Sequence, residues 1–205
     1  MITIVDYGVG NIQALLNLFK KVGIEADCAK TASDLCDSTH LVLPGVGHFD
    51  HAMHRINVSG LRPKLDDLVL GQNVKVLGIC VGMQMLAEGS DEGKLPGLGW
   101  IPGRVRALES EPELKGVPLP HMGWNNVEYR ADSMLFSKGY DTDPQFYFLH
   151  SYYFDAQNKN DVAGVTNYGI KFASIVSRGN IHGIQCHPEK SHRWGVQFLM
   201  NFANL

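Results

Sequence analysis

The segment "VKVLGICVGMQML", residues 74–86, decides the fold expected for this chain. Apart from Lys75, its first half is apolar, as expected for a strand that is covered on both faces of a sheet. Its second half has the spacing of an amphipathic helix. Cys80 lies between them, with Gly78 and Gly82 two residues away on either side. A thiol on a tight strand-to-helix turn needs such small neighbours, because the chain there passes close to itself.

Two similar segments precede it. The apolar run "ITIVD" leads into residues 11–22, where apolar side chains recur at helical spacing, and "HLVLPGVG" at 40–47 is a second strand-like run ended by proline and glycine. Strands that alternate with helices predict a parallel sheet with crossover helices. Reactive groups in such sheets gather beyond the carboxyl ends of the strands, so we expect Cys80 at that edge.

The second half of the chain has a different pattern. Residues 93–126 are rich in glycine and proline, which favours turns and short strands. The later runs "QFYFLHSYYF", "DVAGVTNYG", "KFASIVSRGN" and "IHGIQC" resemble further strands, and residues 192–203 have one apolar helical face. We therefore predict an α/β fold with a doubly wound, mostly parallel sheet, flanking helices and additional antiparallel strands in the second half. One domain is expected over residues 1–205.

The composition excludes several classes of protein. The chain is 44% hydrophobic and 19% charged, and its formal net charge of -3 gives no basic surface for nucleic acid or an anionic membrane. It has no apolar run near the roughly 20 residues of a membrane span, and Met1 leads directly into a strand-like segment, so a cytoplasmic location is expected. Free thiols are expected at its four cysteines, Cys28, Cys36, Cys80 and Cys186.

Cys80 is the first candidate catalytic residue. At a helix N-terminus, unpaired N–H groups and the helix dipole stabilise a thiolate and can donate to an oxyanion. A buried core cysteine is the alternative, since thiolate activation needs a base. A base is available in "HPEKS" at 187–191, where Glu189 could orient the His187 imidazole if the segment is extended. For this segment alone, a surface turn is the alternative.

Taken together, "GICVGMQ" and "HPEKS" resemble the class I glutamine amidotransferases. The segments "DYGVGNI" at 6–12, "LPGVGHF" at 43–49, "PHMGWN" at 120–125 and "HSYYF" at 150–154 look like the glutaminase subunits of imidazole glycerol phosphate synthases within that family. The resemblance covers essentially the whole chain. It implies release of ammonia from L-glutamine by a Cys-His-Glu triad, for use by a (β/α)-barrel cyclase subunit in histidine biosynthesis.

The resemblance also implies a role for particular residues. Cys80 would be the nucleophile, His187 the proton carrier and Glu189 its orienting partner. Backbone N–H groups at Val46, Gly47 and Val81 would bind the oxyanion, after a peptide flip that Gly45 and Gly47 make sterically inexpensive. The substrate-binding positions implied are Gly45, Gln84, Glu92, His150, Ser151 and Tyr152. The positions implied at the cyclase interface are Asn11, Trp124 and Lys190.

Two residues depart from the family pattern, and several alternatives stay open. Cys186 replaces the usual Phe before His187, and Ala14 replaces a usual Ser, which puts the pathway rather than the triad in question. The alternatives are a subunit that supplies ammonia for surface-sugar amidination, the glutaminase of pyridoxal phosphate synthesis, a stand-alone hydrolase or peptidase, and a noncatalytic redox-sensing scaffold. The pyridoxal phosphate glutaminase would carry a Gly-Gly-Glu-Ser-like segment where this chain has "PGVG".

No cofactor or metal is expected. The segment "DYGVGN" lacks the glycine and lysine spacing of a phosphate-binding loop and the third glycine of a dinucleotide fingerprint. His48, His51 and His54 recur every three residues, which could place them near one metal on a helix. A solvent-facing helix is the simpler interpretation, because no carboxylate or cysteine nearby completes a recognisable metal site.

Overall fold

The computed structural model describes residues 1–140 and 142–205. Its strands are β1 (Ile2–Val5), β2 (Ala26–Ala29), β3 (His40–Gly45), β4 (Lys75–Cys80), β5 (Gly89–Ser90), β6 (Gly103–Ala107), β7 (His121–Asn126), β8 (Glu128–Tyr129), β9 (Gln145–His150), β10 (Tyr152–Ala156), β11 (Val162–Tyr168), β12 (Ile170–Arg178) and β13 (Ile181–Ile184). Its α-helices are α1 (Ile12–Lys21), α2 (Phe49–Val58), α3 (Arg62–Asp66), α4 (Val81–Met85) and α5 (His192–Ala203).

The main sheet runs in the order β2-β1-β3-β4-β13-β12-β10-β6-β5, and β11 and β8 extend it from β12. The pairs from β2 to β13 are parallel. These strands are buried on both faces: β1 has four buried residues in succession and β3 and β4 five each. That burial explains their continuous apolar sequence, since side chains point alternately to the two faces.

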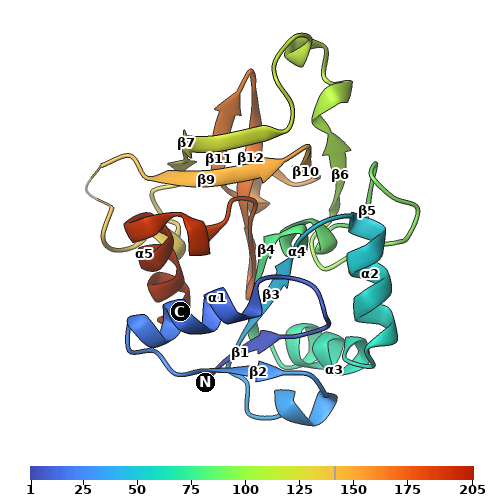
Figure 1. Cartoon of the computed structure of the whole chain (residues 1–205), viewed down its shortest axis with the longest axis vertical. Coiled ribbons are helices and arrows are strands. Elements are labelled where there is room, and N and C mark those ends of the chain that lie inside the picture. The colour runs from blue at the N-terminus through green and yellow to red at the C-terminus, as the bar shows by residue number, and fades with distance from the viewer. Residues whose placement is uncertain (141) are drawn as a thin grey trace.

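Helices flank the parallel strands. Figure 1 shows α1 and α5 on the left of the central strands and α2 and α3 on the right. Phe19 of α1, Phe49 of α2 and Phe198 of α5 are fully buried. Each helix thus contributes an aromatic side chain to the core.

Antiparallel pairing begins in the second half of the chain. β12 pairs antiparallel with β13, β10 and β11, and β6 pairs antiparallel with β10. A separate two-stranded ribbon, β7 with β9, lies at the top of the molecule in Figure 1. The predicted fold class is thereby confirmed. A sheet that joins strands of both halves is consistent with one domain over residues 1–205, which stays a prediction.

Two local expectations were wrong. The helix after Cys80 is not amphipathic: α4 has only five residues, and every one of them is buried. Packing against β3, β4, β13 and α2 encloses it on all sides. The run "QFYFLHSYYF" forms two strands, β9 and β10, with a break at Ser151 that places them in different sheets.

The sequence predicts no membrane-spanning segment, and the helices of the structure can be compared with this prediction. Within residues 1–140 and 142–205, no helix has the length and apolar character needed to cross a bilayer.

Candidate active site

Cys80 lies at the point where β4 becomes α4. Its backbone has φ 55° and ψ -113°, a conformation that costs free energy in a residue other than glycine. The side chain is 5% exposed. The strained turn aims the thiol away from the sheet axis, at the N-terminus of the short helix.

Three glycines make this turn sterically feasible. A Cβ atom on Gly82 would overlap the carbonyl oxygen of Leu43, and one on Gly45 would overlap the amide nitrogen of Gly82. At Gly78 a Cβ would lie 2.5 Å from the carbonyl oxygen of Gly82. The glycines flanking Cys80 therefore allow β3, β4 and α4 to approach backbone to backbone. The close approach of Gly45 to the Gly82 amide also explains why a glycine is needed at position 45.

His187 and Glu189 are brought together as the sequence predicts, by a different local structure. Pro188–Lys190 form a 3-10 turn rather than an extended segment. Within that turn His187 Nδ1 lies 2.9 Å from Glu189 Oε1. The carboxylate accepts a hydrogen bond from the Nδ1–H group, which leaves Nε2 as the ring nitrogen for Cys80. Ser191 fixes the backbone by donating its hydroxyl to the His187 carbonyl at 2.6 Å.

The electrostatics of the pair favour a charged imidazole. Burial lowers the pKa of His187, but hydrogen bonds to the side chains of Cys80 and Glu189 and the charges of both groups raise it to about 10. The ring is therefore protonated on both nitrogens, and so positively charged, at neutral pH. Glu189 Oε1 accepts a hydrogen bond from His187, and among the described residues its buried Oε2 has no hydrogen-bond partner.

A cavity of about 460 Å³ opens above Cys80. Cys80 and His187 both line it, as do most of the residues predicted from the sequence for the oxyanion site and the substrate pocket. These lining residues are Val46, Gly47, Val81, Gln84, Glu92, His150, Ser151 and Tyr152. Segments far apart in the sequence, at 46–47, 80–92, 149–152 and 187–190, thus meet around one space large enough for an amino acid.

The predicted oxyanion residues lie on two sides of Cys80. Val81 is the first residue of α4, where a backbone N–H has no partner within the helix. Val46 and Gly47 follow β3 and are exposed. Gly47 has φ 81°, and a Cβ atom added to it would meet no other atom within 4 Å. Neighbouring atoms therefore do not hinder rotation of the peptide between Val46 and Gly47. Gly45 pairs with Cys80 in the β3–β4 register and sits directly below this segment.

Gln84 and Glu92 have structural contacts besides their place at the cavity. Gln84 Nε2 donates to the carbonyl oxygen of Tyr152 at 3.3 Å and to Gln185 Oε1 at 3.1 Å. Glu92 Oε2 accepts from the amide of Phe49 at 2.8 Å, at the start of α2. Both side chains are thus held in place from the protein side. Their remaining oxygens are the groups left for a ligand.

His150 belongs to a buried chain of neutral groups. Its Nδ1 donates to the carbonyl of Tyr152 at 2.8 Å, and its Nε2 lies 3.0 Å from Nδ1 of His121. Burial lowers the pKa of His150 to about 3 and that of His121 to about 4. Both rings are therefore neutral at pH 7, and they hold Tyr152 at the rim of the cavity.

The three predicted interface residues are all exposed. Asn11 is the N-cap of α1 and accepts from the amide of Ala14 at 3.4 Å. Trp124 on β7 is 46% exposed and stacks on His192 at 5.2 Å between ring centroids. Lys190 lies 5.8 Å from the ring centroid of Tyr147, which Trp124 also contacts. Trp124 and Lys190 thus share one neighbour beside the cavity.

Sequence analysis missed two residues that line the cavity, Pro120 and Leu149. Pro120 begins the quoted segment at 120–125 but was given no role, and Leu149 directly precedes His150, which was. Cys186, in contrast, is fully buried, and burial raises its pKa well above the ordinary value. A thiol in that state is a poor nucleophile, and Cys186 does not line the cavity.

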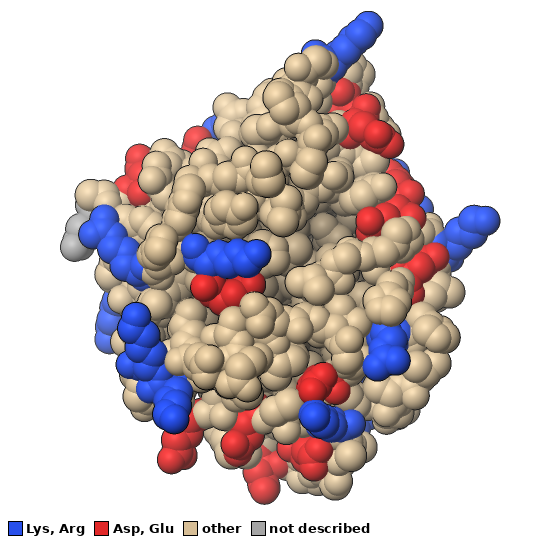
Figure 2. All heavy atoms as spheres, viewed as in Figure 1, with Lys and Arg blue, Asp and Glu red and all other residues tan. Residues whose placement is uncertain are grey.

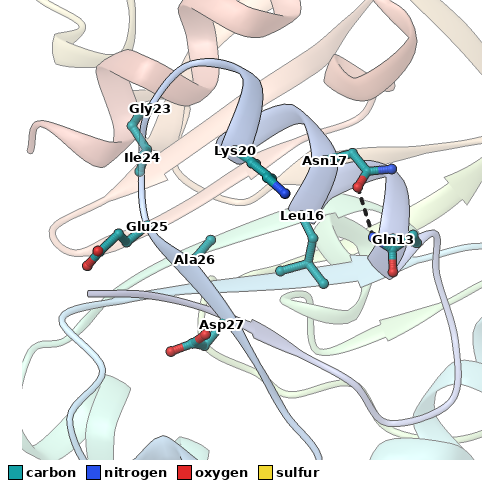
Figure 3. Close-up of a pocket in the computed structure, with 9 residues that line it drawn as sticks. All are labelled: Gln13, Leu16, Asn17, Lys20, Gly23, Ile24, Glu25, Ala26 and Asp27. Carbon is teal, nitrogen blue, oxygen red and sulfur yellow. Dashed lines mark hydrogen bonds between the residues drawn. The ribbon is translucent and has the colours of Figure 1, made fainter.

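A larger cavity, of about 640 Å³, lies elsewhere, between α1 and β2 at the edge of the sheet (Figure 3). It is lined by Gln13, Leu16, Asn17, Lys20, Gly23, Ile24, Glu25, Ala26 and Asp27. It holds no thiol or imidazole, so the smaller cavity is the candidate active site.

The histidine repeat does not gather around a common point. His48 caps α2 by accepting from the amide of Asp50 at 3.2 Å, and His51 and His54 are exposed. Among the residues the structure describes, no three His, Cys, Asp or Glu side chains are grouped so that they could hold a metal ion.

Comparison with known proteins agrees with this geometry. The family model for glutamine amidotransferase class-I matches residues 3–204. The chain is 54% identical to imidazole glycerol phosphate synthase subunit HisH of Bdellovibrio bacteriovorus and 44% identical to that of Leptospira interrogans, in each case over the full length of both chains.

Solved structures share the fold at low sequence identity. A crystal structure of a glutamine amidotransferase superposes with a TM-score of 0.76 at 16% identity, covering 98% of each chain. PurLQS from Thermotoga maritima superposes with a TM-score of 0.73 at 14% identity, covering 99% of this chain and 97% of the other. With its full-length similarity to HisH subunits and its Cys-His-Glu site, the chain belongs to the class I glutamine amidotransferase family.

Proposed function

We propose that the chain is the glutaminase subunit of an imidazole glycerol phosphate synthase, which hydrolyses L-glutamine to L-glutamate and passes the ammonia to a cyclase subunit in histidine biosynthesis. The observation that carries the proposal is Cys80 on its strained turn, facing His187 and Glu189 in a cavity of about 460 Å³. Full-length identity of 54% to a HisH subunit favours this pathway over surface-sugar amidination.

The first half of the reaction breaks the amide bond. The Cys80 thiolate attacks the side-chain amide carbon of glutamine, and the carbonyl oxygen becomes an oxyanion within reach of the backbone N–H groups of Val81 and of the 46–47 segment. As the oxyanion collapses, the C–N bond breaks, and the His187 imidazolium gives its proton to the leaving nitrogen. Ammonia departs and a γ-glutamyl thioester remains on Cys80.

The second half regenerates the enzyme. His187 is now neutral and takes a proton from a water molecule that attacks the thioester carbon. The second oxyanion collapses, the C–S bond breaks, and glutamate leaves with Cys80 again a thiolate beside the imidazolium. Glu189 holds Nδ1 through both steps, so that Nε2 faces the reacting atoms.

The pocket chemistry suits free glutamine. The α-ammonium group needs acceptors, which the remaining oxygens of Gln84 and Glu92 offer, and the α-carboxylate needs donors, which the backbone at 150–152 and the Lys190 ammonium offer. Glu92 is held by the amide of Phe49, so its carboxylate does not swing away when the pocket is empty.

A surface for the cyclase lies beside the pocket. Met122 and Trp124 on β7 are 64% and 46% exposed, and Leu149 on β9, which pairs with Met122, is 39% exposed and also lines the cavity. Figure 2 shows few charged side chains over this ribbon. A partner covering it, a (β/α)-barrel in our proposal, would exclude water from the departing ammonia, and Trp124 is suited to anchor it.

The experiment is glutamate release from glutamine by the purified chain, alone and then mixed with a histidine-pathway cyclase and its ribonucleotide ligand. We expect release to rise at least tenfold in the mixture, because the exposed 46–47 segment is completed by the partner. Equal rates in both conditions would indicate a stand-alone hydrolase. No release in either would reject the synthase, and a surface-sugar partner would be the next to test. A cytoplasmic location stays a prediction.

A further inference from the structure

Gln185 is a buried residue next to the site to which the reaction above gives no role. It follows β13 and is 0% exposed, and its backbone N–H donates to the carbonyl of Ser174 at 2.8 Å. Its Nε2 lies 3.8 Å from Cys80 Sγ, and its Oε1 lies 3.1 Å from Gln84 Nε2. It therefore touches the nucleophile from the protein side, opposite the cavity, whose lining does not include it.

The orientation of this amide is fixed by one carbonyl group. The oxygen of Tyr152 can only accept, so the Gln84 atom 3.3 Å away must be the NH₂ group. The same nitrogen is 3.1 Å from Gln185, which must therefore present its oxygen there. The other end of the Gln185 amide is then the NH₂ group, and it faces Cys80. An amide flipped at either glutamine would set two donors or two acceptors against each other.

The Tyr152 carbonyl is itself held in place. It accepts a second hydrogen bond, from His150 Nδ1 at 2.8 Å, which makes His150 Nε2 an acceptor for His121 Nδ1 at 3.0 Å. His121 Nε2 in turn accepts from Asn125 Nδ2 at 3.2 Å. Each hydrogen bond in this network can therefore run in one direction only, and the carbonyl oxygen of Tyr152 accepts two of them, one for each lone pair. The orientation of Gln185 is thus set by a network that reaches β7.

We propose that Gln185 is a further catalytic residue, whose amide N–H donates to the Cys80 sulfur, favours its thiolate and holds it for attack. The proposal rests on the proposed function, in which Cys80 is the nucleophile. A donor to the charged form of an acid stabilises that form, and the backbone N–H groups of α4 remain free for the substrate oxyanion. Gln84 acts on the sulfur only through Gln185 and is a positioning residue in this respect.

The test is the pH dependence of Cys80 alkylation by iodoacetamide in the full chain, followed by mass spectrometry of the peptide that contains Cys80. Gln185→Met removes the donor, and we expect the midpoint of the alkylation profile to rise by about one pH unit. Gln185→Glu keeps the length and the acceptor for Gln84 but sets a carboxylate against the sulfur, and the midpoint should rise further. It also keeps the test open if the Met variant does not fold.

Ser174→Ala is the matched control. Ser174 is fully buried beside Gln185, and its hydroxyl has no hydrogen-bond partner among the residues that the structure describes, so the midpoint should equal that of the parent chain. Midpoints unchanged in folded Gln185→Met and Gln185→Glu would overturn the proposal. The alkylation profile does not depend on glutamine hydrolysis. A chain that fails to hydrolyse glutamine would refute the proposed function, whereas the alkylation midpoints would still show whether Gln185 stabilises the Cys80 thiolate.

Discussion

At the scale of single residues, the proposed mechanism needs a thiol and an imidazole that share a proton, and a carboxylate that orients the imidazole. The types and order of Cys80, His187 and Glu189 were predictable, because a thiol needs a base and a base needs an orienting partner. Gln185 was not predictable in this way. Its contact with Cys80 depends on a carbonyl of Tyr152, and no local pattern relates those positions.

Replacing the carboxylate of Glu189 tests the electrostatics of the triad. In Glu189→Gln we expect the pKa of His187 to fall below its value of about 10, since a neutral amide no longer attracts the imidazolium. Glutamine hydrolysis should fall by about 10²-fold or more, the usual contribution of a positioned acid–base group. NMR titration of the His187 ring measures the pKa, with the exposed Glu25→Gln as the matched control. Equal pKa values in the two variants would reject the assigned role of Glu189.

The same shift has a consequence for stability, and its sign is set by the direction of the shift. The folded pKa of His187 lies above the roughly 6.5 of an unfolded histidine, so its interactions stabilise the fold fully below that pH. The contribution is lost as the pH rises through about 10. The difference in free energy of unfolding between the parent chain and Glu189→Gln should therefore narrow from pH 7 to pH 10.5, and urea titrations at these two pH values would show it.

At the scale of elements, the position of Cys80 depends on backbone contacts among β3, β4 and α4. The strands were predictable because their apolar runs are uninterrupted, and α5 begins and ends at the predicted residues, 192 and 203. The burial of α4 was not predictable, because its sequence allows an exposed face and only the surrounding elements remove it. The 3-10 turn at Pro188–Lys190 was also missed, since proline permits both extended and turn conformations.

Adding one methyl group at Gly82 tests this packing. The Cβ atom would meet the carbonyl oxygen of Leu43, a backbone atom that cannot rotate away. We expect Gly82→Ala to lower the free energy of unfolding by about 2 kcal/mol or more. Gly71→Ala is the control, because its Cβ would make only an ordinary contact of 3.4 Å with Asp67. Urea unfolding curves measure both, and equal curves would contradict the backbone contact.

At the scale of the whole molecule, both the main sheet and the β7–β9 ribbon contain histidines that are neutral at pH 7. Burial lowers the pKa of His40, His121 and His182 to about 4 and that of His150 to about 3. They lie on β3, β7, β13 and β9, so they connect both halves of the fold. The sequence contains these residues but does not show which of its nine histidines are buried.

These histidines should destabilise the protein in acid. An unfolded histidine has a pKa of about 6.5, so between pH 6.5 and pH 4 the unfolded chain binds more protons than the folded one. Stability is therefore complete above about pH 6.5 and falls as the pH is lowered, by about 2 kcal/mol per fully buried histidine at pH 5. Urea unfolding at pH 7 and pH 5 measures the loss. It should be smaller in His182→Gln and unchanged in the exposed His51→Gln; equal losses in all three would contradict this account.

The nucleophilic role of Cys80 is tested most directly by Cys80→Ala, assayed with the cyclase subunit for imidazole glycerol phosphate synthesis. We expect synthesis from glutamine to be lost and synthesis from added ammonium salts to continue at the parent rate, because the variant removes only the nucleophile and the cyclase still receives ammonia. If the variant retained the parent rate with glutamine, Cys80 would not be the nucleophile, since no thioester could form on alanine.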